Sequence, residues 1–331
     1  MDDGATAVAV LGTGSIGMRH LGALRRLANV RPIAIPKRRE RLGWLAEAGF
    51  STAADLQEAV REGARLCIIA TDTRQHVPDG LIASEQGLDL LVEKPMAPDA
   101  AIASRLRLTA RASSRKMFIG CVLRFSESLN TVRELLGQVG CLHDVRIECQ
   151  SYLPAWRPER PYQESYSARA DEGGVLRDLI HEVDYAGWLF GWPTVLQARV
   201  RNLGRLRIEA DEATDLLWET AEGSTVSVRL DYLSRPSRRR LRVSGEHGTL
   251  AWDGIEGTVT LALADAPARV IRSSQTRDEM VVAQAEAFIQ ASRGACDPRL
   301  ATADDGVNAL AVCDAARRAS ESKREERVEY L

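Results

Sequence analysis

The sequence predicts an α/β domain built on a parallel sheet, followed by an α+β domain with an open, mostly antiparallel sheet. Three observations carry this prediction. The length of 331 residues suits two domains of ordinary size. In the first 120 residues, short apolar runs alternate with amphipathic stretches, and after about residue 140 apolar residues alternate singly with polar ones. We therefore expect domains at residues 1–124 and 125–331.

The first part of the chain predicts a parallel sheet that is covered on both faces. Its apolar runs have the length of buried strands, and the stretches between them have apolar residues at helical spacing. The expected strands are Ala7–Leu11, Pro32–Ile35, Leu66–Ala70, Leu90–Val92 and Met117–Gly120. The expected helices are His20–Leu27, Arg41–Ala48, Ala53–Val60 and Ala101–Ala110, the last entered through Pro98 and Asp99.

The second part predicts an open sheet with one face in water, because many strands alternate apolar and polar residues between turns that contain glycine. The expected strands are Val145–Tyr152, Val195–Val200, Ala213–Trp218, Ser224–Tyr232, Leu241–Ser244, Thr249–Trp252 and Thr258–Leu263. Gly174–Phe190 and Asp278–Ala319 have helical spacing instead, the second with an interruption near Gly294–Pro298. The basic run Arg235–Arg242 is interpreted as a solvated edge of the sheet rather than a binding patch.

Composition argues against several classes of protein. Lys plus Arg number 44 and Asp plus Glu 46, so a net charge of −2 gives no general attraction to nucleic acid or an anionic membrane. No apolar run approaches the ~20 residues that span a bilayer, and the acidic start at residues 1–4 does not fit a secretory signal. The six cysteines form no CxxC pair and no cluster with histidine at metal spacing. We therefore expect a cytoplasmic protein with reduced thiols, no metal site, and no nucleic-acid or membrane partner.

A glycine-rich segment joins the first expected strand to the first helix. It reads Leu11-Gly12-Thr13-Gly14-Ser15-Ile16-Gly17, a G-x-G-x-x-G pattern. The glycines permit a tight turn and a close approach of the backbone to a pyrophosphate, and the helix N-terminus offers N–H groups to the phosphates. A tight strand–helix turn without a ligand also favours glycine. The flanking strand and helix favour dinucleotide binding through Gly12, Gly14, Ser15, Ile16 and Gly17.

The residues after the second expected strand bear on which dinucleotide binds. An acid that holds the ribose usually lies about 20 residues beyond the glycines. Here that region contains Lys37, Arg38 and Arg39, with no acid at the strand end. A basic cluster suits the 2′-phosphate of NADP(H), so we expect NADP(H) in preference to NAD(H). Two alternatives stay open: the cluster faces solvent, or Glu40 is the missing acid and the strand boundary is misplaced.

Two further motifs accompany the glycine segment. Glu93-Lys94-Pro95 directly follows the fourth expected strand, and residues 173–184, GGVLRDLIHEVD, begin a helix in the second part. With the glycine segment, these motifs resemble the three signatures of the Gfo/Idh/MocA family, named for glucose–fructose oxidoreductase and inositol dehydrogenase. The resemblance covers nearly the whole length and includes Ala70–Thr73 with His76, Arg124-Phe125 and Gly245–Leu250.

This resemblance implies a Rossmann domain followed by an open sheet that often builds a homodimer or homotetramer. It also implies that the final helix packs back on the first domain. Most members oxidise a ring hydroxyl of a sugar, sugar phosphate, nucleotide sugar or cyclitol, or run the reverse reduction. Thr71, Thr73, His76 and Arg124 correspond to positions near the cofactor, NADP or NAD.

The resemblance makes Lys94 the main catalytic candidate, at the carboxyl end of a parallel strand, where ligands bind in open α/β sheets. Hydride loss from a carbon requires removal of the hydroxyl proton, and an ammonium ion stabilises the alkoxide that develops. Pro95 would fix the turn that aims Lys94, and the family pattern implies a cis bond there. Glu93 is expected to reach the cofactor ribose. A surface lysine after a strand is the alternative.

Asp178 and His181 lie three residues apart on one expected helix, so they should face the same side. His181 is the natural proton acceptor, because the reference pKa of histidine lies near operating pH, and Asp178 would orient it or hold a substrate hydroxyl. Many family members space this pair by four residues, which favours His181 over Asp178. Asp184 is interpreted as a supporting carboxylate, and the other histidines, His20, His143 and His247, as structural.

A long segment rich in rings and hydrogen-bonding side chains, Tyr152–Ser167, precedes this helix. Loops longer than ~12–15 residues in compact domains are usually functional or disordered. Trp156, Tyr162 and Tyr166 are candidates to stack on a sugar or the nicotinamide, and Arg157 to hold a phosphate or carboxylate. Packing of the loop against its own domain is the alternative.

The leading hypothesis is an NAD(P)-dependent dehydrogenase or ketoreductase acting on a hydroxyl or keto group of a sugar, nucleotide sugar or cyclitol derivative. Lys94 would stabilise the alkoxide, His181 would move the proton and Asp178 would position it. A second hypothesis is a redox-neutral enzyme that keeps NAD(H) bound and uses transient oxidation for epimerisation, elimination or glycoside cleavage. A third is an NADP-binding regulatory protein without turnover.

Overall fold

The computed structural model describes residues 5–331 and divides into two compact units. The acidic start, residues 1–4, lies outside the described residues. The first unit ends its main segment at Phe125 and also contains Thr276–Val307, whereas the second consists of Ser126–Gln275 and Asn308–Leu331. The sequence predicts Thr276–Val307 in the second domain, and the structure corrects this: the chain returns to the first unit.

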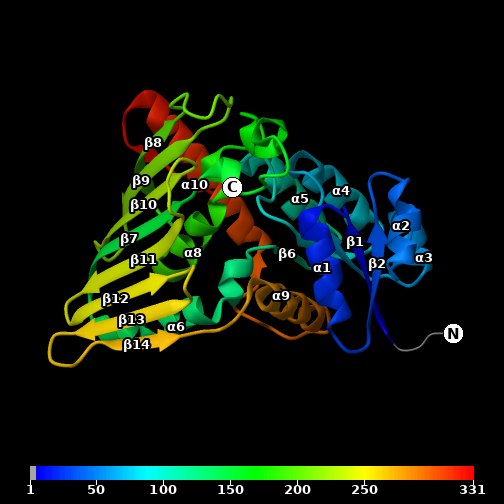
Figure 1. Ribbon diagram of the computed structural model, residues 1–331, viewed down its shortest axis with the longest axis horizontal. Helices are drawn as coiled ribbons and strands as arrows, with labels where there is room; N and C mark the ends of the chain where they lie inside the picture. Colours follow the sequence, from blue (N-terminus) through cyan, green and yellow to red (C-terminus); the bar gives the residue numbers. More distant parts are fainter. Residues whose placement is uncertain (1–4) are drawn as a thin grey trace. The chain divides into compact units, whose positions relative to one another are not determined.

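A seven-stranded sheet forms the centre of the first unit (Figure 1). In spatial order its strands are β15 (Ala301–Thr302), β6 (Met117–Ile119), β5 (Asp89–Val92), β4 (Leu66–Ile69), β1 (Thr6–Leu11), β2 (Val30–Ile35) and β3 (Ser51–Thr52). Neighbouring strands pair in parallel, apart from β15 with β6. The predicted parallel sheet is confirmed, and its strand order reverses between β1 and β4, where such sheets bind ligands.

The helices of this unit include one that lies far along the chain. They are α1 (Ser15–Arg25), α2 (Arg41–Glu47), α3 (Leu56–Arg61), α4 (Thr73–Glu85), α5 (Ala100–Ala112), the 3-10 helix η1 (Val122–Phe125) and α9 (Arg277–Ser292). Asp99 caps α5 by accepting a hydrogen bond from the Ile102 amide at 2.7 Å, as predicted. The spacing of apolar residues does not predict α4, because Pro78 and several buried polar residues interrupt its apolar face.

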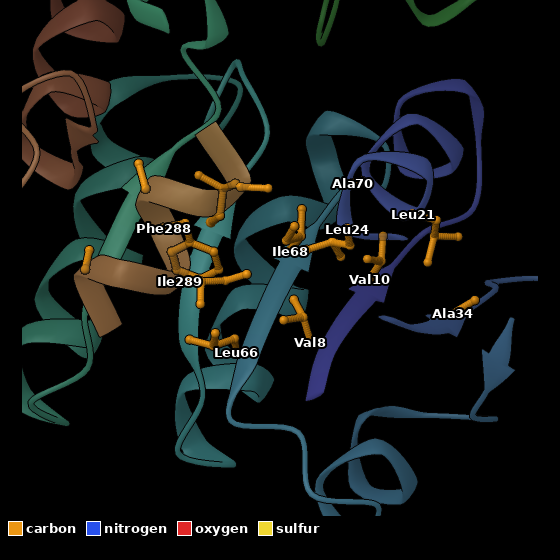
Figure 2. Close-up of a cluster of buried hydrophobic side chains, with 14 of the residues drawn as sticks. Val8, Val10, Leu21, Leu24, Ala34, Leu66, Ile68, Ala70, Phe288 and Ile289 are labelled. Carbon is orange, nitrogen blue, oxygen red and sulfur yellow. The ribbon is translucent and has the colours of Figure 1, made fainter. Parts of the chain in front are cut away.

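The core of the first unit explains why Thr276–Val307 belongs to it. Figure 2 shows Phe288 and Ile289 of α9 in the same cluster as Val10 and Ile68. Phe288 is fully buried, and its ring meets the edge of the Phe118 ring at a centroid distance of 6.2 Å. The resemblance implies that the final helix packs back on the first domain. In the structure, the helix that packs on α1 is α9. The last helix, α10 (Ala303–Ser322), begins in the first unit and continues in the second.

A nine-stranded sheet forms the second unit. In spatial order its strands are β14 (Arg269–Arg272), β13 (Thr258–Leu263), β12 (Gly248–Asp253), β11 (Arg238–Gly245), β7 (Leu142–Gln150), β10 (Thr225–Asp231), β9 (Ala213–Glu219), β8 (Val195–Arg201) and β16 (Glu326–Arg327). The predicted antiparallel character is confirmed for most pairs, but β7 and β10 are parallel. The helices α6 (Glu127–Leu135), α7 (Val175–Asp178) and α8 (Ile180–Phe190) pack on strands of this sheet.

The sheet face opposite these helices carries a stripe of alternating charge. Directly opposed residues across six neighbouring strands are Arg199, Asp215, Arg229, Glu148, Arg240 and Asp253. Arg229 Nε lies 3.7 Å from Asp215 Oδ1, and Arg240 Nε lies 3.3 Å from Asp253 Oδ2. Opposite charges placed directly across strands contribute modestly to the stability of the pairing. We call these six residues the charged stripe.

The charged stripe also corrects the interpretation of the basic run. β11 lies between β12 and β7, inside the sheet, so the prediction that Arg235–Arg242 forms a solvated edge is wrong. Side chains alternate between the two faces of a strand. Arg240 accordingly belongs to the charged stripe, and Arg239 points to the helix-covered face, where its Nε donates to Glu182 of α8 at 2.8 Å.

Candidate active site

The glycine segment between β1 and α1 is shaped as a phosphate cradle. Gly12 has a φ of +95°, and a Cβ there would lie 2.5 Å from the Ala70 carbonyl oxygen. A Cβ on Gly17 would lie 1.9 Å from the Gly12 oxygen. Gly14 differs, because a Cβ there would meet no described atom within 4 Å. Two glycines thus close the turn, and the third leaves open space beside the backbone.

The N-terminus of α1 opens onto this space with its backbone donors uncapped. Among the described residues, no side chain caps the helix at Gly14, and its first turn, which begins Ser15-Ile16-Gly17, contains no acid. Unpaired N–H groups and the positive end of the helix dipole attract anions. The cradle at Gly14 therefore fits the pyrophosphate of a dinucleotide.

The basic cluster after β2 is partly neutralised. Lys37 Nζ lies 3.0 Å from Asp79 of α4, which also accepts a hydrogen bond from the Thr71 hydroxyl at 2.9 Å. Arg38 and Arg39 are exposed. Arg41, which the sequence analysis did not select, donates to the Thr13 carbonyl in the glycine segment at 2.7 Å. Its place at the end of the basic run was the signal available in the sequence.

The Glu93-Lys94-Pro95 motif follows β5, and its carboxylate is buried. The Lys94–Pro95 peptide bond is cis, as the resemblance implies. Glu93 Oε1 lies 2.7 Å from His20 Nε2 of α1, and its Oε2 accepts from the Lys94 amide at 3.2 Å. Burial alone would raise the pKa of Glu93, but the hydrogen bond and charge of His20, with the charge of Lys94, hold that pKa below its ordinary value.

His76 and the two threonines near it lie in the connection from β4 to α4. The His76 ring is buried between two backbone carbonyls, with Nδ1 2.9 Å from Pro95 O and Nε2 3.0 Å from Thr71 O. Burial lowers the pKa of His76, although both carbonyl contacts oppose that change. Thr73 begins α4 and is also buried. His76 thus links the loops after β4 and β5.

Arg124 is one of the largest fully buried side chains in the described chain. Its Nη1 lies 3.3 Å from Asp305 Oδ2, and Asp305 also accepts from the Thr302 amide and hydroxyl. This network ties η1 to the start of α10 within the first unit. Arg124 therefore has an anionic partner of its own inside the protein.

In the second unit, Asp178 lies in a buried group of hydroxyls. The Tyr232 hydroxyl donates to Asp178 Oδ2 at 2.5 Å. The charge of Asp178, with burial and a hydrogen bond to it, raises the pKa of Tyr166, and burial with the same charge raises the pKa of Tyr232. Tyr166 was selected from the sequence, whereas Tyr232, just beyond β10, was not. The carboxylate thus faces two neutral phenols.

The signature helix is broken between Asp178 and His181. α7 ends at Asp178, α8 begins at Ile180, and Leu179 between them has a φ of −96° and a ψ of 30°. The prediction of one continuous helix over Gly174–Phe190 is therefore wrong, and so is the argument that helical spacing aligns the two side chains. Both remain buried. Gly174, with a φ of +93°, lets Asp211 approach the start of α7 and accept from the Leu176 amide at 2.9 Å.

The loop between β7 and α7 contains three short 3-10 helices, η3 (Leu153–Ala155), η4 (Tyr162–Glu164) and η5 (Tyr166–Ala168). Trp156 is 40% exposed, packs edge-on against Tyr232 at 5.4 Å and donates from Nε1 to Ser151. The Tyr162 hydroxyl donates to the Leu206 carbonyl at 3.1 Å. Arg157 is exposed, and its charge opposes the rise in the pKa of Tyr166 that Asp178 and burial cause. The loop places Trp156 against Tyr232 and Tyr166 beside Asp178. Tyr162 anchors the loop through its hydrogen bond to Leu206.

Comparisons with known proteins agree with this arrangement. Residues 6–121 match an oxidoreductase family with an NAD-binding Rossmann fold, and residues 130–251 match the GFO/IDH/MocA C-terminal domain. The chain belongs to the Gfo/Idh/MocA family. It is an oxidoreductase whose first unit has the fold that binds a nicotinamide dinucleotide. The predicted family and fold class are confirmed.

Individual relatives match along nearly the full length. The rhizopine catabolism protein MocA of Rhizobium meliloti is 30% identical over 93% of both chains. Inositol 2-dehydrogenase 1 of Saccharopolyspora erythraea is 28% identical over 95% of this chain and 94% of its own. A levoglucosan dehydrogenase solved with NADH superposes with a TM-score of 0.88 at 16% identity, covering 99% of this chain and 100% of that one. The last similarity concerns the fold alone.

The described residues offer neither a metal-binding cluster nor a membrane-spanning helix. Within residues 5–331, no group of three or more His, Cys, Asp or Glu side chains is arranged to hold a metal ion. None of the helices in that range combines the length and apolar character that spanning a membrane requires.

We predict that the buried Glu93 carboxylate stabilises the fold in a pH-dependent way. Because its folded pKa lies below its unfolded value, its contribution is present above pH ~4.5 and is lost as the pH falls through the folded pKa. Glu93→Gln should cost about 1.5–3 kcal/mol near pH 7, the usual value for a hydrogen bond to a charged group. Urea unfolding of the two proteins between pH 7 and pH 3 measures the difference.

The difference between Glu93→Gln and the unchanged protein should shrink below pH ~4.5. Exposed Glu47→Gln, on α2, is the matched control and should change unfolding free energy by less than about 0.5 kcal/mol. A Glu93→Gln difference that stays constant across this range contradicts the assignment of a depressed carboxyl pKa.

Proposed function

We propose that this protein is an NAD(P)-dependent dehydrogenase or ketoreductase of a hydroxyl or keto group on a sugar, nucleotide sugar or cyclitol derivative. The observation that carries the proposal is the buried Asp178 carboxylate beside the Tyr166 and Tyr232 hydroxyls, close in sequence to His181. Such a group suits a ligand rich in hydroxyls. Relatives named for inositol and levoglucosan support the same substrate class.

We assign the chemistry to three side chains. The Lys94 ammonium stabilises negative charge on the substrate oxygen, and a ring nitrogen of His181 takes the hydroxyl proton. Asp178 holds a substrate hydroxyl or orients the imidazole. A bound nicotinamide dinucleotide supplies hydride exchange at its C4. Gly12, Gly14, Ser15, Ile16 and Gly17 hold its pyrophosphate, and Thr71, Thr73, His76, Glu93 and Arg124 shape the surrounding loops.

The exposed ring of Trp156 and the guanidinium of Arg157 supply further substrate contacts in this proposal. Trp156 has its indole N–H engaged with Ser151, so its exposed ring face is what it offers to a sugar. Arg157 suits a carboxylate or phosphate on the substrate. Tyr162 supports the loop through the Leu206 carbonyl. The six free cysteines favour a reducing, cytoplasmic setting.

We predict that Lys94→Met and His181→Gln each lower kcat by roughly 10²–10⁴-fold, the usual worth of a positioned acid or base. The assay follows reduced nicotinamide absorbance with NAD⁺ and NADP⁺ against a panel that includes myo-inositol and levoglucosan. Lys323, an exposed lysine just beyond α10, provides the matched control, and Lys323→Met should retain full activity.

The same panel separates the three hypotheses. Nucleotide that copurifies with the protein and turns over substrate without net reduction would favour the redox-neutral enzyme. Two results together would favour the regulatory protein and count against the dehydrogenase. No panel compound would be turned over, and Lys94→Met and His181→Gln would leave dinucleotide binding intact.

We further propose that NADP(H) is preferred. The support is the absence of an acid at the end of β2 and the exposed Arg38 and Arg39, which are available to a 2′-phosphate. Lys37 contributes less, because Asp79 neutralises it. Arg41 adds a positive charge beside the glycine segment.

We predict that 2′,5′-ADP binds roughly tenfold more tightly than 5′-ADP, as one charge-assisted contact would provide. Isothermal titration calorimetry measures both affinities without turnover. The double variant Arg38→Ala, Arg39→Ala should abolish the difference, Asp79→Asn should enlarge it by releasing Lys37, and Arg61→Ala on α3 should leave it unchanged. Equal affinity for the two nucleotides in the unchanged protein contradicts the preference.

We also propose a homodimer or homotetramer formed through the open face of the nine-stranded sheet. The charged stripe supports this, because alternating charges complement a second copy in reversed orientation. Leu217, on the same face, is 41% exposed. Sedimentation analysis should give a multiple of 36.3 kDa. Leu217→Arg should yield monomers, and Ile255→Arg, in the β12–β13 turn, should not. A monomeric unchanged protein contradicts the proposal.

A further inference from the structure

Asp211 makes the first backbone contacts of α7, the short helix that ends at Asp178. α7 begins after Gly174, which offers no side-chain cap. Asp211 Oδ2 accepts a hydrogen bond from the Leu176 amide at 2.9 Å, and the Asp211 carbonyl accepts one from the Val175 amide at 3.0 Å. Two of the donors that a helix start leaves unpaired are therefore taken by one residue from the loop before β9.

The Asp211 carboxylate fits closely between α7 and α10. A Cβ on Gly174 would lie 2.3 Å from Asp211 Oδ1, and the φ of +93° at Gly174 is one that other residues rarely adopt. The same Oδ1 accepts a hydrogen bond from Arg317 Nη2 of α10 at 3.0 Å. One carboxylate oxygen thus binds α7 and the other binds α10, so the position of Asp211 is fixed from both helices.

The residue after Asp211 holds the partner of Asp178. The Glu212 carbonyl accepts a hydrogen bond from the Tyr232 amide at 2.9 Å, and the Tyr232 hydroxyl donates to Asp178 Oδ2 at 2.5 Å. Glu212 is fully buried, and its carboxylate accepts hydrogen bonds from backbone amides of the preceding loop. Asp211 and Glu212 therefore anchor the two chain segments that the Asp178–Tyr232 hydrogen bond joins.

A helix of about one turn depends on such contacts for its position. α7 contains four residues, Val175–Asp178, and isolated helices of that length do not form in water. Each residue advances a helix by ~1.5 Å, so Asp178 lies only ~3 Å along the axis from the capped Leu176 amide. A displacement of the helix start by ~1 Å would carry Asp178 with it and stretch its bond to Tyr232 beyond the ~3.0 Å limit for two oxygens.

We propose that Asp211 is a positioning residue: held by Arg317, it sets the place of α7 and thereby aims the Asp178 carboxylate at Tyr232 and at the substrate. This inference rests on the substrate-binding role proposed for Asp178. Asp211 acts through the helix and does not itself contact the substrate. The site then depends on a carboxylate that lies 33 positions beyond Asp178 in the sequence.

The test observes the Tyr232 phenol in the full-length protein. The protein is labelled with 3-fluorotyrosine, whose ¹⁹F chemical shift responds to hydrogen bonding of the phenol, and the chain contains 6 tyrosines. Tyr232→Phe identifies the Tyr232 resonance by its loss, and Asp178→Ala shows how that resonance moves when the acceptor is removed. No substrate or dinucleotide is needed, so inactivity toward the substrate panel and failure of this inference are separate results.

We expect Asp211→Ala to move the Tyr232 resonance in the same direction as Asp178→Ala, because α7 loses its cap and Asp178 its fixed position. Asp99→Ala is the matched control, since it removes the side-chain cap of α5 in the first unit and lowers stability in the same way. It should leave the resonance in place. An unmoved resonance in Asp211→Ala overturns the inference. An equal movement in Asp99→Ala also overturns it, because a general loosening would then explain the effect.

A chemical rescue tests the contribution of Arg317 and replaces the first comparison if Asp211→Ala fails to fold. Arg317 and Asp211 line a cavity of about 200 Å³ whose wall includes exposed Glu321, so a small cation can reach the space that Arg317→Ala leaves. We expect Arg317→Ala to move the Tyr232 resonance. Methylguanidinium, at concentrations that do not unfold the protein, should return it by restoring the contact with Asp211.

Urea at the same concentration is the control for this rescue, because it is planar and of similar size but uncharged. It should not return the resonance. A Tyr232 resonance that does not move in Arg317→Ala overturns the inference, as does a moved resonance that methylguanidinium fails to return. An equal return by urea overturns it as well, since filling of the space would then replace the ion pair as the explanation.

Discussion

The close approach of the glycine turn to β4 is the constraint on which the nucleotide-binding unit depends. Gly12 and Gly17 have no room for side chains, because backbone atoms of Ala70, Thr71 and Gly12 itself occupy the space. This contact presses the start of α1 against the ends of β1 and β4, where the strand order reverses. The same approach places His20, farther along α1, within reach of Glu93 at the end of β5. A larger residue at either glycine would move the cradle and the lysine loop together.

Buried carboxylates form the second organising feature, and each is matched by a donor from another element. Glu93 meets His20, Asp178 meets Tyr232, and Glu182 meets Arg239. An unpaired charge in such positions would cost several kcal/mol, so each pair constrains the packing of the two elements that supply it. Burial raises the pKa of Glu182, and Arg239 opposes that change. The pair fixes α8, which carries His181, against β11.

The sequence predicts the features that local periodicity controls. The parallel strands, the glycine turn, the capped start of α5 and most of the second sheet follow from the spacing of apolar residues and from turn chemistry. The parallel pairing of β7 with β10 does not, because it joins strands that are far apart in the chain. The break at Leu179 is likewise hidden, since the residues around it remain compatible with a continuous helix. α9 has helical spacing, but nothing local indicates which unit it covers.

The same distinction, between local sequence signals and contacts distant in sequence, applies to the candidate site residues. The candidate residues Lys94, Asp178 and His181 are indicated by motifs of adjacent residues, whereas His20, Asp79, Arg41 and Tyr232 stand out only through partners that are distant in sequence. A lone histidine on an apolar helix face is more often structural than functional, and its contact with Glu93 across 73 positions has no sequence signal. Tyr232 directly follows a strand whose pattern is fully explained by burial, so nothing in the sequence singles out its hydroxyl, and its contact with Asp178 exists only in the folded chain.

The basic run after β2 shows that the number of cationic side chains in a segment does not determine the electrostatic potential at a binding site. Lys37 through Arg39 are consecutive in the sequence, but Lys37 is paired with Asp79, whose second oxygen also accepts from Thr71. Asp79 lies on α4, so its negative charge is close to the residues after β2 only in the folded chain. Arg38, whose Nε lies 3.9 Å from Glu40 Oε1, and Arg39 are exposed to solvent, where salt screens their attraction for a phosphate. Arg41, held against the Thr13 carbonyl, keeps its charge beside the backbone that forms the cradle. The electrostatic potential beside the glycine segment therefore depends on how each cation is held, rather than on the number of cations in the run.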